Sequence, residues 1–152
     1  MIHALIMIAA MSMPGHLLAA RGDYQYDAST GTCHDAAGIR GYNVVDLDEL
    51  FTSREGAPGE FPARSAECVD FSGVTFGDYI GLEYPIVKNW NFAGANFTRA
   101  VVSFVKIVDA DLRGVDLTGL TLSYGFISGT VDEHTRALGV CRLDRMRVTC
   151  LH

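Results

Sequence analysis

The sequence predicts an all-β fold in which the chain turns in the same direction once every five residues. A large apolar residue returns at every fifth position ten times in succession, at Leu82, Val87, Phe92, Phe97, Val102, Ile107, Leu112, Leu117, Leu122 and Ile127. A second apolar register lies two positions earlier and is mostly smaller, as at Ala95, Ala100, Ala110 and Val115. A repeat of this length is a fold-level signal that takes precedence over local propensities.

A period of five fits neither an α-helix nor a flat strand, whose side chains repeat about every 3.6 and 2 residues. In a straight strand, successive members of an odd repeat would point to opposite faces. The chain must therefore turn once per repeat, so that the first and third residues of each five stay inside. Glycine recurs at the fifth position, where it allows a turn at low steric cost, at Gly94, Gly114, Gly119 and Gly129.

Residues 95–99 (ANFTR), 110–114 (ADLRG) and 115–119 (VDLTG) resemble the pentapeptide-repeat motif, A(D/N)LxG. The resemblance implies a right-handed quadrilateral β-helix with four repeats, or twenty residues, per coil and about three coils in all. This rule implies the inner stacks Phe92 on Leu112, Phe97 on Leu117, Val102 on Leu122 and Ile107 on Ile127. On the outside it places Asn91 over Asp111 and Asn96 over Asp116.

The repeat is irregular at its start. Residues 69–78 form two good repeats, but Phe76 and Leu82 are six positions apart, which indicates one inserted residue near 77–79. Pro85 and Trp90 also stand where the repeat favours a small residue. We therefore expect the first coil to bulge.

The composition suits one compact domain, since 49% of the 152 residues are hydrophobic and 20% are charged. We divide the chain into an expected signal peptide (1–20), an N-terminal capping segment (21–68), the repeats (69–129) and a C-terminal cap (130–152). Asp46 as N-cap and Glu49 three positions later predict a short helix over 46–54 in the first cap. The C-terminal cap is expected to be a hairpin. Caps are needed because an open coil end would expose apolar side chains and unpaired backbone groups.

Residues 1–20 contain no Asp, Glu, Lys or Arg and include the apolar run 4–13. This pattern is typical of a secretory signal peptide, here cut near Ala20, and the run is too short for a membrane-spanning helix. We expect a secreted or periplasmic protein with no membrane span after the leader is removed. The alternative is an apolar N-terminal strand or helix that is retained in a cytoplasmic protein.

An even number of cysteines fits disulfides formed outside the cytosol. Of the three pairings of four cysteines, position favours Cys33 with Cys68 before the repeats and Cys141 with Cys150 after them. A zinc site is disfavoured because no CxxC or HxxxH spacing is present.

The sequence favours a structural or interaction module over an enzyme, because no catalytic motif or cofactor fingerprint occurs. We expect no catalytic, cofactor-binding or metal-binding residues. The family resemblance also implies an alternative, a cytosolic DNA mimic that binds gyrase. Residues 69–129 carry six acidic and four basic residues, too mild a charge for a DNA-like surface, and nucleic acid is not an expected partner.

Three aromatic residues occupy fifth positions at twenty-residue spacing, Tyr84, Phe104 and Tyr124, with Val101 beside them. They should stack up one face as a ladder. Either the N-terminal segment folds over this ladder and buries it, or the ladder is a contact strip for an unknown protein or glycan partner. The same aromatic face could join copies of the chain into an oligomer.

Overall fold

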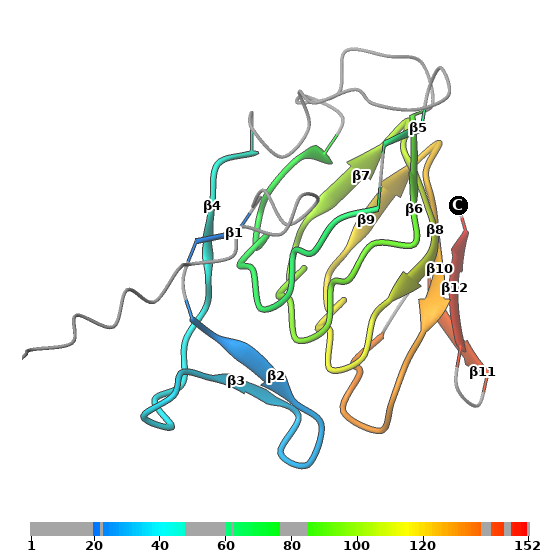
Figure 1. Ribbon diagram of the computed structural model, residues 1–152. Helices are drawn as coiled ribbons and strands as arrows, with labels where there is room; N and C mark the ends of the chain where they lie inside the picture. Colours follow the sequence, from blue (N-terminus) through cyan, green and yellow to red (C-terminus); the bar gives the residue numbers. More distant parts are fainter. Residues whose placement is uncertain are drawn as a thin grey trace, which may run out of the picture.

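The structure is a computed structural model that describes residues 20–21, 23–47, 60–61, 63–76, 85–137, 141–144 and 147–151. The expected signal peptide up to residue 19, most of the helix expected over 46–54, and Tyr84 lie outside these residues. Strands and tight turns make up nearly all of the described chain (Figure 1). The strands are β1 (Ala20–Arg21), β2 (Gln25–Asp27), β3 (Thr32–His34), β4 (Val44–Val45), β5 (Glu60–Phe61), β6 (Ile86–Lys88), β7 (Val101–Ser103), β8 (Lys106–Asp111), β9 (Thr121–Ser123), β10 (Phe126–Thr130), β11 (Cys141–Asp144) and β12 (Arg147–Leu151).

The repeats pair with one another in parallel, at a spacing of twenty residues. Strand β6 pairs with β8, β8 with the start of β10, and β7 with β9, as successive arrows in Figure 1 show. Isolated bridges on the other faces keep the same spacing from Asn91 onward, as between Asp116 and Arg136, whereas the earlier parallel bridges span twenty-six residues. The expected pairs are confirmed for Val102 with Leu122, Ile107 with Ile127, Asn91 with Asp111 and Asn96 with Asp116.

The expected bulge at the start of the repeats is confirmed, but it is larger than one residue. Thr75 pairs with Val101, twenty-six positions on, whereas Ile86 pairs with Lys106, twenty positions on. Six extra residues therefore separate Thr75 from Ile86. The apolar period alone does not reveal a whole additional repeat, because adding five residues leaves the phase of the pattern unchanged.

Parallel pairing also continues beyond the segment 69–129 on both sides. Asn43 pairs with Val69 before it, and Asp116 pairs with Arg136 after it. The six-stranded sheet has the order β11-β12-β10-β8-β6-β5, in which the hairpin β11–β12 is added antiparallel to β10. The C-terminal cap is therefore a continuation of the repeat sheet, with Cys141 bonded to Cys150 across the hairpin.

The core consists of the two apolar registers. Members of both registers from Val87 to Ile127 are buried, and so are Phe71 and Phe76 from the earlier repeats. Trp90, which occupies a small-residue place, is fully buried and stacks on Phe92 with ring centroids 5.7 Å apart. Neighbouring phenylalanine rings add further contacts, so the early repeats have an aromatic core and the later ones an aliphatic core.

The Asp or Asn before each central apolar residue has a specific role in the turn. Its side-chain oxygen accepts the backbone N–H two residues later, which is the Asx-turn arrangement. The distances are 2.9 Å for Asn91, Asn96 and Asp116, 3.2 Å for Asp111 and 3.0 Å for Asp132. These polar residues thus fix the corners as well as solvating the outer face.

Candidate functional site: an exposed aromatic corner

Phe104 and Tyr124 form an exposed, stacked pair that we call the aromatic corner. Phe104 follows β7 and Tyr124 follows β9, and the parallel pairing of these strands places the two rings one above the other. Their centroids are 5.2 Å apart and their planes differ by 14°. The residues are 46% and 68% exposed. Val101, the expected neighbour of the ladder, is paired with Thr121 at the start of the same strands.

The backbone at the aromatic corner is left-handed, with φ of 55° at Phe104 and 54° at Tyr124. Every fifth position from residue 89 to residue 124 shares this conformation, namely Asn89, Gly94, Arg99, Phe104, Asp109, Gly114, Gly119 and Tyr124. A left-handed residue with a side chain costs about 1–2 kcal/mol, and a bulky one is unusual there. One stacked aromatic pair contributes only about 0.5–1.5 kcal/mol of stabilising free energy. Glycine would fit at both places without this strain.

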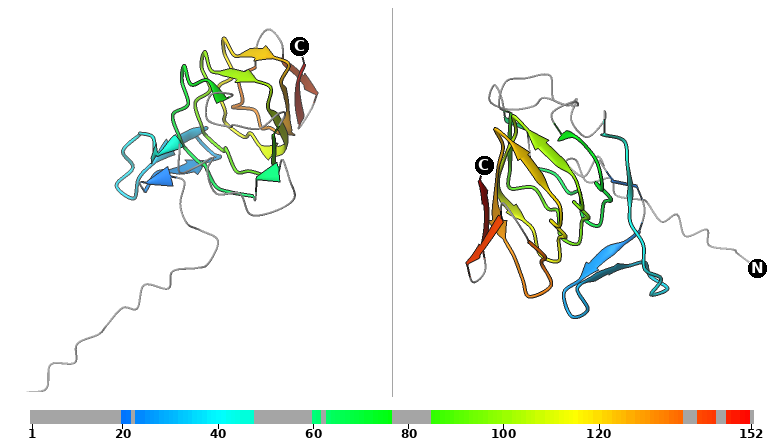
Figure 2. Two further views of the ribbon diagram at one scale, coloured as in Figure 1. Left: turned by 90° about the horizontal axis from the view of Figure 1, so that it is seen from above. Right: turned by 180° about the vertical axis from the view of Figure 1, so that it is seen from behind.

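The N-terminal hairpin does not cover these two rings. Strands β2 and β3 lie over another face (Figure 2), along a series of fifth positions that we call the glycine column: Cys68, Gly94, Gly114 and His134. A Cβ at Gly114 would lie 2.2 Å from Tyr26 Cε2, and one at Gly94 would lie 2.4 Å from Cys33 Sγ. In the described part of the chain, the interpretation in which the N-terminal segment buries the ladder is therefore wrong for Phe104 and Tyr124.

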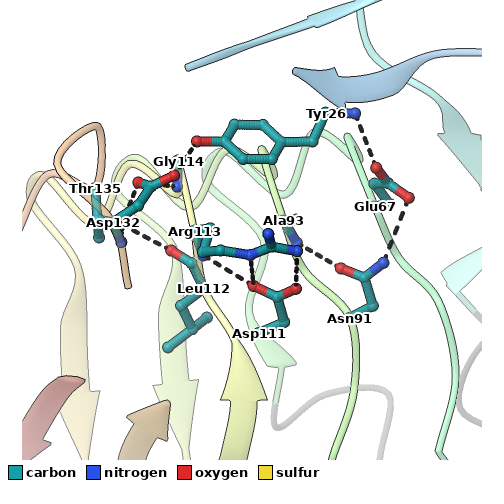
Figure 3. A network of polar contacts seen from close by, with 10 residues as sticks. All are labelled: Tyr26, Glu67, Asn91, Ala93, Asp111, Leu112, Arg113, Gly114, Asp132 and Thr135. Carbon is teal, nitrogen blue, oxygen red and sulfur yellow. Dashed lines mark hydrogen bonds and ion pairs between the residues drawn. The ribbon is translucent and has the colours of Figure 1, made fainter. Parts of the chain in front are cut away.

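A polar network holds the hairpin on the glycine column (Figure 3). The Tyr26 hydroxyl donates to Asp132 Oδ2, and the Tyr26 backbone N–H donates to Glu67 Oε1 at 2.8 Å. Glu67 Oε2 accepts from Asn91 Nδ2 at 3.3 Å. Asp132 Oδ1 also accepts the backbone N–H of Gly114 at 2.9 Å. One tyrosine thus connects a carboxylate of the first repeats with one of the last.

The two ends of the glycine column fix the hairpin directly. Cys68 is bonded to Cys33 of β3 at one end. At the other end His134 Nε2 lies 3.1 Å from the carbonyl oxygen of Ala28, and its ring is so close to Gly31 that a Cβ there would be 2.3 Å away. The cysteines thus occur in the two expected pairs, and the Cys33–Cys68 bond joins the hairpin to the repeats.

The titration of Tyr26 and Asp132 reflects this contact. Burial, together with the hydrogen bond to Asp132, raises the pKa of Tyr26 well above its ordinary value. Burial alone would raise the pKa of Asp132, but hydrogen bonds from Tyr26, Gly114, His134 and Thr135 lower it overall. The phenol therefore stays protonated and the carboxylate stays charged throughout the neutral range.

The polar network of Tyr26, Glu67 and Asp132 was not predicted from the sequence. The signal that was available is the glycine column itself, in which two glycines at one outer position are flanked by Cys68 and His134. Two adjacent glycines on an outer face indicate that another segment approaches closely. The sequence does not show which segment that is.

A shallow pocket of about 270 Å³ lies beside this network and includes Asp109 and Asp111 in its lining. Arg113 binds Asp111 through two hydrogen bonds, at 2.9 and 2.7 Å, which occupies both carboxylate oxygens. Within the described residues, no three His, Cys, Asp or Glu side chains form a group suited to a metal ion. Nor does any described helix have the length and apolar character needed to cross a membrane.

Comparison with known proteins identifies the repeat. The family model for pentapeptide repeats matches residues 89–131 with eight copies. Residues 89–131 are therefore pentapeptide repeats. Searches among curated proteins and among solved structures returned no match. The aromatic corner, with Phe104 and Tyr124, lies within the matched residues.

Replacing Gly114 by alanine should loosen the hairpin. The new Cβ would overlap the Tyr26 ring, whereas a Cβ at Gly73 would meet nothing within 4 Å, and both glycines are left-handed, with φ of 65° and 70°. We expect Gly73→Ala to cost about 1 kcal/mol of unfolding free energy from strain alone, and Gly114→Ala at least about 1 kcal/mol more from overpacking. Denaturant unfolding measures both losses, and equal values would contradict the contact between Tyr26 and the glycine column.

Tyr26 should also make stability depend on alkaline pH. Because folding raises the pKa of Tyr26 above its ordinary value of 10.0, the stabilisation from Tyr26 is complete below that value and is lost as pH rises toward the folded pKa. We expect unfolding free energy, measured between about pH 8 and pH 11, to fall less in Tyr26→Phe than in the wild type. Tyr124→Phe is the control and should keep the wild-type dependence. Identical curves for Tyr26→Phe and wild type would rule out the Tyr26–Asp132 contact.

Proposed function

We propose that this pentapeptide-repeat protein is an exported, non-enzymatic binding module that holds sugar rings of a glycan at the aromatic corner. The observation that carries the proposal is the exposed stack of Phe104 on Tyr124, kept at two strained backbone positions. Residues held in strained backbone conformations cluster at functional sites. The remaining features of the molecule support a rigid presentation of this pair.

The supporting scaffold in this proposal is a right-handed quadrilateral β-helix of about three coils. The twenty-residue parallel pairing between β7 and β9 and between β8 and β10 supports it. So do the tight turns in which an N–H bonds to the carbonyl three residues earlier, as from Ala95 to Phe92 and from Leu120 to Leu117. The aromatic corner would then stand on consecutive coils and move little when a ligand binds.

The size of the aromatic corner favours a glycan over a protein partner. A stable protein interface buries roughly 800 Å² on each side, which two side chains at one corner do not supply. An aromatic ring, by contrast, offers an apolar face for a single small ligand ring. Hydroxyl groups of Ser103, Ser123 and Thr121 lie on the adjoining strands, where they can pair with sugar hydroxyls.

A non-enzymatic role agrees with how the polar side chains are used. Tyr26, Glu67 and Asp132 hold the hairpin on the glycine column, and Asp111 is bound by Arg113. The carboxylates best placed for acid–base chemistry therefore already have structural partners. We assign the protein neither a cofactor nor a metal.

Export is supported by the two disulfides, because such bonds persist in oxidising compartments. The gyrase-binding alternative is not favoured. The described C-terminal residues form the hairpin β11–β12, closed by Cys141–Cys150, and the repeats carry the mild charge noted from the sequence.

Export predicts a processed, oxidised protein. We expect the native protein, isolated from its source, to begin near residue 21 and to show no free thiol, with peptides linked as Cys33–Cys68 and Cys141–Cys150. Amino-terminal sequencing and non-reducing peptide mapping measure both properties. A cytosolic protein that keeps Met1 and has four free thiols would overturn the proposal of export.

Sugar binding predicts that the two aromatic residues matter for ligands and little for stability. The double variant Phe104→Ser/Tyr124→Ser should keep its unfolding free energy within about 1 kcal/mol, because exposed positions contribute little. It should lose the saturation-transfer NMR signal that neutral and acidic hexasaccharides give with the wild type. Tyr42→Ser is the control, since Tyr42 is also 46% exposed but lies away from the corner. Loss of folding in the double variant, or an unchanged ligand signal, would contradict the proposal.

A further inference from the structure

The outer face of the six-stranded sheet carries the only two lysines of the chain. Lys88 is on β6 and Lys106 on the neighbouring strand β8, and both are exposed. Arg142, on β11 of the same sheet, is exposed as well. Cations from three strands thus stand on one face of an otherwise acidic protein.

Strand register explains how the two lysines are arranged. Lys106 pairs with Ile86 on one side and with Phe126 on the other, and Lys88 pairs with Val108. The lysines are therefore diagonal neighbours on adjacent strands. Ile86, Val108 and Phe126 are half-buried between the two lysines. We call these three apolar side chains, which surround the lysines on the outer face, the apolar floor.

The charge of this lysine face is opposite to that of the whole molecule. The chain has a net charge of −6, and the ion pairs between described residues involve Arg113 and His134, not the lysines. The outer row of Lys88 contains no carboxylate among the described residues, whereas Glu60 of β5 pairs with Ile86 at the edge of the row that contains Lys106. Asp109 and Asp111 follow these rows further along β8. A local positive face on an acidic protein directs anionic partners to that face.

The lysine face is continuous with the aromatic corner. Phe104 precedes Lys106 by two residues, and Tyr124 precedes Phe126 by two residues. The corner and the first outer row of the sheet therefore adjoin at the level of β8 and β10. A chain-like ligand that passes the corner would run across strands that are about 4.8 Å apart and meet the lysines next.

We propose that the ligand is an anionic glycan, a linear chain of carboxylated sugars that crosses β10, β8 and β6 beside the aromatic corner. This inference rests on the proposed function and specifies its ligand class. The sugar rings contact Tyr124 and Phe126, and the sugar carboxylates pair with Lys106 and Lys88. The ammonium groups supply attraction that is weakened by salt, and the apolar floor holds the sugar backbones.

The test measures binding of hexagalacturonate to the full folded protein by titration calorimetry, with neutral cellohexaose beside it. We expect hexagalacturonate to bind more tightly, and to weaken as salt is raised. Lys88→Gln/Lys106→Gln should weaken hexagalacturonate binding about tenfold, the loss expected for two exposed charge contacts, and leave cellohexaose unchanged. Arg40→Gln/Arg99→Gln is the matched control, because it removes two exposed charges elsewhere, and it should change neither affinity by more than about twofold.

The other outcomes separate this inference from the proposed function. Equal affinity for the two sugars, with no effect of the lysine substitutions, would overturn the anionic ligand and leave the aromatic corner as a glycan site. Binding of neither sugar would overturn both proposals. If poly-L-glutamate binds as tightly as hexagalacturonate, the face recognises acidic peptides and the glycan assignment is wrong. An equal loss of hexagalacturonate affinity in the arginine control would show that the effect depends on net charge alone. That result would also overturn the proposal of an anionic glycan.

Discussion

Parallel backbone pairing between residues twenty positions apart is the interaction on which the rest of the structure depends. It aligns each position with the same position four repeats later, as for Val102 with Leu122 in the core and Asn96 with Asp116 on the outer face. Side chains far apart in sequence therefore stand in columns. Because each column holds one kind of position, a single residue type can be repeated or replaced there without disturbing the core.

The left-handed backbone of the fifth positions has different roles in two columns. In the glycine column, Gly94 and Gly114 leave room for the Tyr26 ring, while Cys68 and His134 at its ends attach the hairpin. At the aromatic corner, Phe104 and Tyr124 accept the same left-handed backbone with large exposed rings. The first arrangement contributes to stability, and we infer that the second contributes to recognition.

The sequence predicted the parts of the structure that follow from periodicity. The inner registers and the stacking of Phe104 on Tyr124 depend only on counting by five and by twenty, and the cysteine pairs follow from position along the chain. The six extra residues between Thr75 and Ile86 escaped prediction because the apolar period stays in phase whether or not a whole repeat is added to a coil. The contact of Tyr26 with Asp132 escaped it because the two residues are 106 positions apart and share no pattern.

The most direct test of the account is a comparison of two distances by electron paramagnetic resonance. Nitroxide labels on Ser103→Cys and Ser123→Cys, which are paired on β7 and β9, should show strong dipolar broadening. Labels on Ser103→Cys and Arg113→Cys are separated by half as many residues but should show much weaker broadening. Ten residues are half of the twenty that separate paired positions, so these two labels are expected on opposite sides of the coil. Stronger broadening for the pair that is nearer in sequence would contradict the twenty-residue register and every column that depends on it.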